Sequence, residues 1–409
     1  MAEGTGYFDM LRTRHAARLL GGTLLGRLPN AMAALAIVLF TRAEGGDYTL
    51  AGALSALYGV ATAIGQPLLG RAVDKRGQSA VMAGSALLSA AGFALFAAVG
   101  PHPVVLAAVA VVVAGLFTPP LEAGLRALWP SVLRRDDQVH AAYALDASAQ
   151  EVMFAIGPLL VTLVVAWASE ATALVVTGLL GVAGTLVVVT SRPSRDWRGE
   201  AREPHWLGAL RAPGLRVLFA SLFFVGVALG SIAVSSVAYA DEHGGGTQAG
   251  WLLAALGAGA LTGGLVYGSR KWRGTPERRL KLLMVGLAVC YLPLSLVPGL
   301  AAMIVLSGIS GVFLAPVLAC AFVVVDRHAP VGTVTEAFSW LVTAFGVGAS
   351  IGTAAAGPAA QYGGIVAGYA VAGAGGIVAL LVLLVTGRGL AGHADRSSPE
   401  PVAASLADK

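Results

Sequence analysis

The sequence predicts an all-α membrane protein with twelve transmembrane helices arranged as two six-helix bundles. Its composition, the length of its apolar segments and the placement of its basic residues predict this class. Of the 409 residues, 56% are hydrophobic and 12% are charged, whereas soluble domains carry about 25% charged residues. So few charges cannot cover the surface of a soluble protein of 41.3 kDa. A soluble enzyme, a nucleic-acid-binding protein and a disordered chain are therefore excluded.

The apolar residues form blocks of about 20, which is the length of a helix that spans a bilayer. They do not alternate with polar residues as the strands of outer-membrane barrels do. The predicted spans are 15–41, 48–70, 79–99, 103–127, 140–168, 171–190, 214–240, 248–269, 280–298, 300–325, 336–360 and 363–387.

Basic residues fix the predicted orientation of these spans. With the N-terminus inside and alternating spans, all but two of the 27 Lys and Arg residues fall in inside segments. The two exceptions are Arg42, in an outside loop, and Arg27, deep in the first span. This asymmetry follows the positive-inside rule. It predicts a multi-pass protein of the bacterial cytoplasmic membrane with both termini cytoplasmic.

The chain divides into two similar halves. The predicted organisation is an N-terminal six-helix bundle at 1–190, a cytoplasmic linker at 191–213, a C-terminal bundle at 214–390 and a disordered tail at 391–409. Gly52, Gly59, Gly65 and Gly70 recur 198 residues later in the sequence as glycines. Two parallel repeats with a site between them are an architecture of secondary transporters.

The loop after the second span reads Gly70-Arg71-Ala72-Val73-Asp74-Lys75-Arg76-Gly77. This segment resembles motif A of the major facilitator superfamily, in which Gly, Asp, a basic residue and a second Gly recur at this spacing. The resemblance covers residues 1–390 and implies the major facilitator fold and transport by alternating access. Two departures weaken the motif: Gln78, Ser79 and Ala80 replace the basic residues expected next, and Trp272 stands opposite Asp74 in the second repeat.

Motif A is predicted to act as a latch built from Gly70, Asp74, Lys75, Arg76 and Gly77. Glycine lets helix ends approach a neighbour closely. A fixed carboxylate accepts hydrogen bonds from the N-terminus of a helix, here the one beginning near residue 336. Such a contact holds the halves together on the inside and breaks when they rock. The alternative is a solvated charged turn.

Gly157 and Pro158, in the fifth span, are similar to motif C of drug–proton antiporters. That resemblance implies an efflux protein of the antiporter type. It is partial, because Met153 and Val161 stand where the motif has small residues. A proline without this role only kinks its helix.

Ionisable residues inside the membrane are costly and are therefore functional candidates. Arg27 and Glu151 lie at similar predicted depths, and we expect them to pair. Asp146, about 8 Å nearer the cytoplasm, is expected to compete for Arg27 or to conduct protons to Glu151. These three residues are the predicted proton-coupling group. The alternative is that Arg27 and Glu151 form a structural ion pair that fixes packing.

Two further groups are predicted. Glu122 and Arg126 are four residues apart on the fourth span, with Glu first, and are expected to form a self-contained structural ion pair. Asn30, Phe154, Glu336 and Trp340 are candidates for a cavity wall, although Glu336 is equally suited to the positive N-terminal end of its helix.

Function follows from what the spans lack. The chain has one Asn, Asn30, so a strongly polar substrate finds few hydrogen-bonding partners. We therefore expect proton-coupled export of amphipathic or hydrophobic small molecules by a chain that acts as a monomer and is not an enzyme. No metal, cofactor or nucleic acid is expected; the coupling ion is the proton. The alternative is an uptake carrier or facilitator for a sugar, organic acid or peptide.

Overall fold

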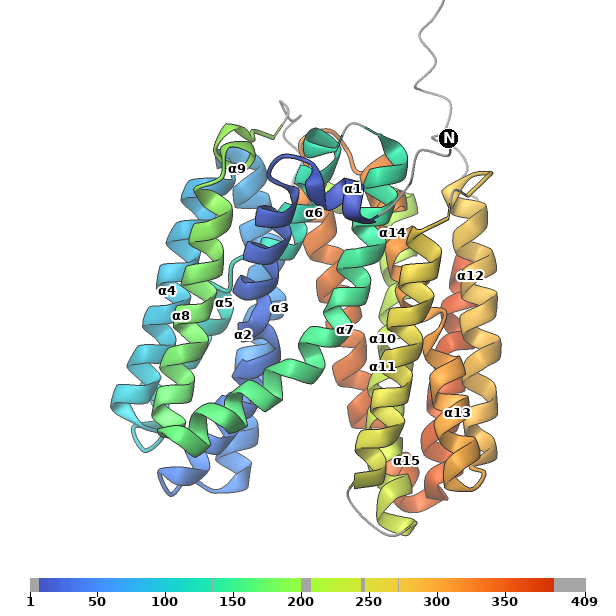
Figure 1. The fold of residues 1–409 in the computed structure, drawn as a ribbon. Coiled ribbons are helices and arrows are strands. Elements are labelled where there is room, and N and C mark those ends of the chain that lie inside the picture. Colours follow the sequence, from blue (N-terminus) through green and yellow to red (C-terminus); the bar gives the residue numbers. More distant parts are fainter. Residues whose placement is uncertain (1–6, 134, 200–206, 244–246, 271, 386–409) are drawn as a thin grey trace, which may run out of the picture.

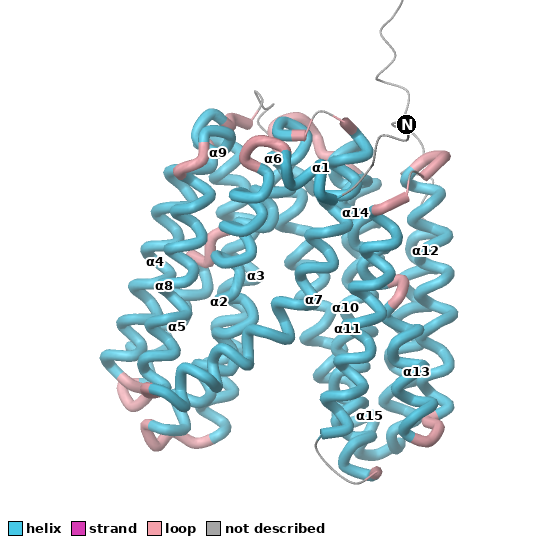
Figure 2. Tube along the Cα trace, in the orientation of Figure 1, coloured by secondary structure: helices cyan, strands magenta, loops and turns pink. Residues whose placement is uncertain are grey.

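The computed structural model describes residues 7–133, 135–199, 207–243, 247–270 and 272–385, and all regular structure in these ranges is helical (Figures 1 and 2). The predicted tail at 391–409 lies outside them. The first-half elements are α1 (Tyr7–Arg12), α2 (Ala16–Ala43), α3 (Tyr48–Arg76), α4 (Gln78–Val99), α5 (Val104–Leu116), α6 (Leu121–Val132), α7 (Asp136–Trp167) and α8 (Glu170–Val189). The remaining elements are α9 (Arg192–Asp196), η1 (Gly208–Arg211), α10 (Pro213–Glu242), α11 (Thr247–Gly268), α12 (Pro276–Tyr291), η2 (Leu292–Leu296), α13 (Leu300–Gly311), α14 (Leu314–His328) and α15 (Val334–Val385).

The helices account for the predicted spans. Within the described residues, 10 helical stretches are long and apolar enough to cross a membrane. One of them, α15, has 52 residues and contains two helices that meet at Gly364, where φ is 76°. The 32-residue α7 adds another helix of sufficient length. The twelve-helix, all-α fold class is therefore confirmed.

The helices pack as two groups. Figure 1 shows α2–α8 on one side and α10–α15 on the other, and the packing inside each group is similar. Gly65 of α3 packs on the backbone carbonyl of Leu116, and Gly263 of α11 packs on that of Val312. These two glycines are a pair from the sequence repeat. Their equivalent contacts explain why both copies keep glycine, since a side chain at either position would meet a backbone oxygen.

The two groups contact each other closely at the end where α3 finishes at Arg76, which we call the basic end (Figure 1, top). Here a Cβ on Gly70 of α3 would lie 2.5 Å from Oγ of Ser339 in α15. One step further along, Oγ1 of Thr343 donates to the carbonyl of Ala63 at 3.2 Å. Beyond that contact the helices diverge: a Cβ on Gly59 would meet no described neighbour within 4 Å.

The crossing of α7 with α11 repeats this pattern. The rings of His140 and Tyr267 contact each other with centroids 4.6 Å apart and an angle of 54° between their planes, and Gly264 packs against Ser148. Further from the basic end, Gly257 has no described neighbour within 4 Å of a Cβ position, and Val152 is 39% exposed. The two halves are therefore closed at the basic end and separated at the opposite end.

Candidate transport site and gate

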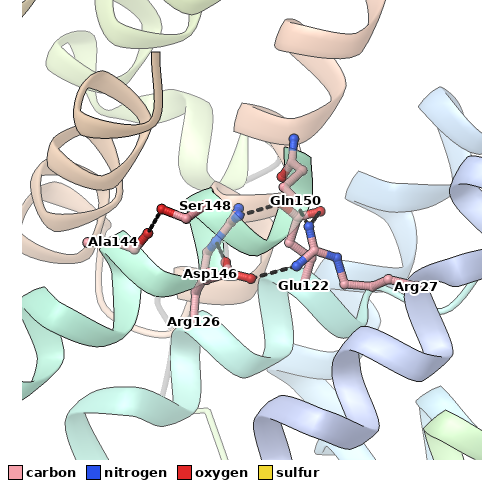
Figure 3. Close-up of polar contacts among 7 residues, drawn as sticks. All are labelled: Arg27, Glu122, Arg126, Ala144, Asp146, Ser148 and Gln150. Atoms are coloured by element: carbon pink, nitrogen blue, oxygen red, sulfur yellow. Dashed lines mark hydrogen bonds and ion pairs between the residues drawn. The ribbon is translucent and has the colours of Figure 1, made fainter. Parts of the chain in front are cut away.

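A cluster of charged side chains lies buried between α2, α6 and α7 (Figure 3). Arg27 donates through Nη1 to Oδ1 of Asp146 at 2.6 Å and lies 3.1 Å through Nη2 from Oε2 of Glu122. Arg126 donates through Nε to Oδ2 of Asp146 at 2.8 Å and through Nη2 to Oε1 of Glu122. Each carboxylate thus bridges both guanidinium groups. We call these four residues the charge cluster.

Burial makes the composition of the charge cluster important. Arg126 and Asp146 are fully buried, the Arg27 side chain is 4% exposed and that of Glu122 is 10% exposed. Two cations and two anions give a neutral set when all are ionised. Removing one member of such a set leaves an uncompensated buried charge, and this is strongly destabilising.

The structure changes the predicted pairing of Arg27. Its partners are Asp146, Glu122 and Gln150, whose Oε1 lies 3.0 Å from Nη2. Asp146 therefore takes the place that the sequence analysis gave to Glu151. The side chains of Glu151 and Phe154 lie outside the described residues. Gln150 was missed, although it follows Asp146 by four residues and thus lies on the same face of α7.

The prediction of a self-contained Glu122–Arg126 pair is wrong. The two side chains do contact each other at the expected spacing. However, Glu122 also contacts Arg27, and Arg126 also binds Asp146. Both residues therefore belong to the same cluster as the predicted coupling residues, because α6 begins directly after Pro120 and its first turns face α2 and α7.

Asp74 lies where the latch interpretation expects it. Its carboxylate accepts hydrogen bonds from the first backbone N–H groups of α15: Oδ1 from Thr335 at 3.1 Å and Oδ2 from Glu336 at 2.8 Å. These N–H groups have no partner within their own helix, and the helix dipole favours an anion there. Gly77, with φ of 89°, ends α3 directly beyond. Lys75 and Arg76 are exposed.

Glu336 joins the same contact from the other side. Its Oε1 lies 2.6 Å from Nη2 of Arg71 and accepts from the backbone N–H of Ala209 at 3.4 Å. The side chain is fully buried, so in this state it does not line an open cavity, and the cavity prediction for Glu336 is wrong. The ion pair between Arg71 and Glu336 therefore adds a second contact between the halves beside the hydrogen bonds of Asp74.

The remaining predicted residues are distributed over the open region and its edge. Asn30 is exposed on α2, one turn beyond Arg27. Trp340 is half-buried, and its Nε1 has no hydrogen-bonding partner among the described residues. Gly157 packs against α2, where a Cβ would lie 2.5 Å from that of Ala31. Pro158 lies inside α7, which bends over its second half (Figure 1).

Comparisons with known proteins identify the family. The sequence model of the Major Facilitator Superfamily matches residues 19–302, more than half of the chain. A search of curated protein sequences finds no match.

Solved structures share the fold. A bacterial homologue of the iron transporter ferroportin, in an outward-facing state, matches with a TM-score of 0.70, 15% identity, and 91% of this chain and 99% of that one covered. The human organic anion transporter MFSD10 matches with a TM-score of 0.68 and 15% identity, and the match covers 90% of this chain and 99% of that one. The fucose:proton symporter FucP of E. coli matches with a TM-score of 0.66 and 15% identity, and the match covers 90% of this chain and 98% of that one. This chain belongs to the major facilitator superfamily and is a multi-pass membrane transporter.

Proposed function

We propose that this transporter exports amphipathic or hydrophobic small molecules in exchange for protons. The observation that carries the proposal is the charge cluster: two carboxylates, each bridging two arginines, inside membrane-spanning helices. Coupled export needs a buried acid whose surroundings change as the halves rock. Asp146 and Glu122 are such acids, and Glu151, five residues beyond Asp146, is the third candidate.

The surfaces that face the open region support an apolar substrate. The face of α7 that begins at Ser148, against α11, continues through Val152 and Ile156, which are 39% and 42% exposed. The corresponding faces of α3 and α11 present Gly59 and Gly257. Sites for small molecules are mostly apolar with a few polar groups. Asn30 and Gln150 are polar groups near this surface.

Orientation and state complete the proposal. The basic end is placed in the cytoplasm by the positive-inside rule, which makes the described conformation outward-open and puts both termini inside the bacterial cytoplasmic membrane. In this state the acids take up protons from outside. Closing the outer end and releasing the Asp74 latch then expose the same acids to the cytoplasm. The chain performs this cycle as a monomer, without metal or cofactor.

The test is transport by purified protein in proteoliposomes with an imposed pH gradient and a panel of lipophilic dyes and cations. Wild type is expected to concentrate substrate on the acidic side of the membrane, because protons that flow down their gradient are exchanged for substrate moving the other way. Asp146→Asn or Glu151→Gln is expected to lose uphill transport and keep downhill exchange. Asp196→Asn, at an exposed acid of α9, is the matched control. If the Asp146 and Glu151 variants both still concentrate substrate, these two acids do not couple transport.

The alternative function is uptake or facilitated diffusion of a polar nutrient. One structural neighbour is a fucose:proton symporter, so the fold accommodates that activity in another protein. Inward accumulation of a sugar, organic acid or peptide driven by the proton gradient, with no movement of lipophilic compounds, would replace the export proposal.

A further inference from the structure

Arg126 is held from both halves of the transporter. Within the first half it donates hydrogen bonds to Asp146 and Glu122. From the second half, the ring of Phe322 in α14 lies against its guanidinium, with the central carbon 3.5 Å from the ring centroid. Arg126 is fully buried and Phe322 is 1% exposed. This geometry is a cation–π contact without intervening water.

The neighbouring aromatic residues show that the contact with Phe322 is specific. Phe338 of α15 lies 6.0 Å from the same guanidinium carbon, at the limit of the interaction. Tyr143 of α7 packs edge-on against Phe322 at 6.0 Å. Nη1 of Arg126 has no hydrogen-bonding partner within the described residues. The face of Phe322 is therefore the main contact that the second half offers this cation.

The contact lies between the two halves of the transporter. Phe322 belongs to α14 and Arg126 to α6, so the contact joins the two halves and lies on the side where they are closed. Packed interfaces of this kind exist in discrete arrangements. We expect Arg126 to keep its carboxylates and to lose the ring when the halves part at the basic end.

We propose that Phe322 is a positioning residue that links protonation of the charge cluster to closure of the basic end. The ring and the carboxylates stabilise the same cation. When a carboxylate is neutralised, the ring therefore contributes a larger share of the stabilisation of Arg126. Protonation and the closed basic end then favour each other, and the reciprocal effect is required by linkage. The inference rests on the proposed proton coupling and specifies how it reaches the gate.

The charged and titratable groups around this contact come from several helices. Arg27 is contributed by α2, Glu122 by α6, and Asp146 and Tyr143 by α7. Asp326 of α14 contributes a carboxylate near Tyr143 from the second half, and α15 contributes the ring of Phe338. Uptake of a proton can neutralise only the carboxylates of this set, because the arginines are already protonated. Acidification is therefore expected to favour the outward-open state.

The experiment measures the ratio of outward-open to inward-open molecules at about pH 8 and about pH 6 without substrate. Spin labels on Arg192→Cys and Arg278→Cys, exposed positions in the two halves, report separation of the basic end after Cys290 and Cys320 are replaced by Ala. The variants are Phe322→Leu, which removes the ring face, and Phe322→Trp, which keeps one. Phe338→Leu is the matched control from the same aromatic group.

In wild type and Phe338→Leu, acidification is expected to raise the ratio. In Phe322→Leu that rise shrinks by about tenfold, and Phe322→Trp restores it. A merely structural role would lower the ratio equally at both pH values and leave the rise unchanged, which overturns the inference. If the ratio of outward-open to inward-open wild-type molecules is the same at both pH values, the proton-coupling proposal is overturned together with this inference. A pH response in wild type that persists in Phe322→Leu overturns the role of Phe322 alone.

Discussion

Asp74 Oδ2 lies 2.8 Å from the backbone nitrogen of Glu336, and 262 positions of sequence separate the two residues. The first lies in the last turn of α3 in one half, and the second lies in the first turn of α15 in the other. The same Glu336 carboxylate returns to the first half through Arg71. The hydrogen bonds of Asp74 and the ion pair of Arg71 thus join the halves at the same place, and we expect the closed state of the basic end to depend on both.

Asp74→Asn is expected to slow transport while leaving substrate binding intact. The amide keeps an acceptor oxygen but loses the charge that the helix N-terminus favours, a difference of about 1 kcal/mol or more. This weakens the closed state about fivefold to tenfold. Transport rates in proteoliposomes test the expected slowing, and equilibrium binding in detergent tests whether substrate affinity is unchanged. Lost affinity with unchanged interconversion would contradict the latch.

Arg71→Gln is expected to weaken closure more than Glu336→Gln does. The Arg71 side chain is 30% exposed and can reach water, whereas the Glu336 side chain is fully buried. Removing the cation leaves a buried carboxylate with less compensating charge, which costs about 2–3 kcal/mol, and the double variant recovers most of it.

The exposed Arg192–Asp196 pair in α9 is the control for this comparison, since exposed pairs contribute about 0–1 kcal/mol. Labelling of a cysteine at the closed interface by a membrane-permeant reagent measures opening. If Arg71→Gln and Glu336→Gln weaken closure of the basic end equally, the different burial of the two side chains does not determine the cost of breaking the pair.

Gly70→Ala is expected to open the basic end, and Gly59→Ala is expected to be neutral. A Cβ on Gly70 would lie 2.5 Å from Oγ of Ser339 and 3.0 Å from the carbonyl oxygen of Thr335, while one on Gly59 meets nothing within 4 Å. Overpacking of this kind costs about 1–3 kcal/mol. The distance distribution between spin labels on the two halves distinguishes the variants. Identical distributions would mean that α3 and α15 adjust without separating.

Arg27→Ala is expected to destabilise the fold by about 3–5 kcal/mol, because Asp146 and Glu122 then share one arginine in a buried site. Adding Asp146→Asn should recover part of this loss by restoring neutrality. Arg18→Ala, at an exposed arginine of the same helix, is the control. Thermal unfolding in detergent provides the measurement, and an additive double variant would show that the residues are not coupled.

The orientation of the molecule is tested by cysteine labelling in whole cells. A membrane-impermeant reagent is expected to label Glu242→Cys, at the end of α10, without permeabilisation. It should label Arg192→Cys only after permeabilisation, because α9 belongs to the basic end. Both positions are exposed. The opposite result would invert the assignment of the conformation as outward-open.

The sequence determined the fold class, because crossing a bilayer imposes a length and an apolar composition on each helix separately. It also indicated the contact of Asp74 with the start of α15, since a loop carboxylate and an N-terminal helix end on the same side of the membrane are complementary through backbone chemistry alone.

The tertiary structure decided which charged groups meet. Asp146 and Glu151 lie five residues apart, about 140° around a helix, and depth in the membrane does not reveal which one faces Arg27. Packing fixes that rotation: Ser148 lies against Gly264 and Gly157 against Ala31, which turns Asp146 and Gln150 toward α2. The contact of Arg126 with Phe322 and the closure of only one end depend on how the two halves dock. Side-chain packing between helices distant in sequence sets that docking, and no local pattern of residues encodes it.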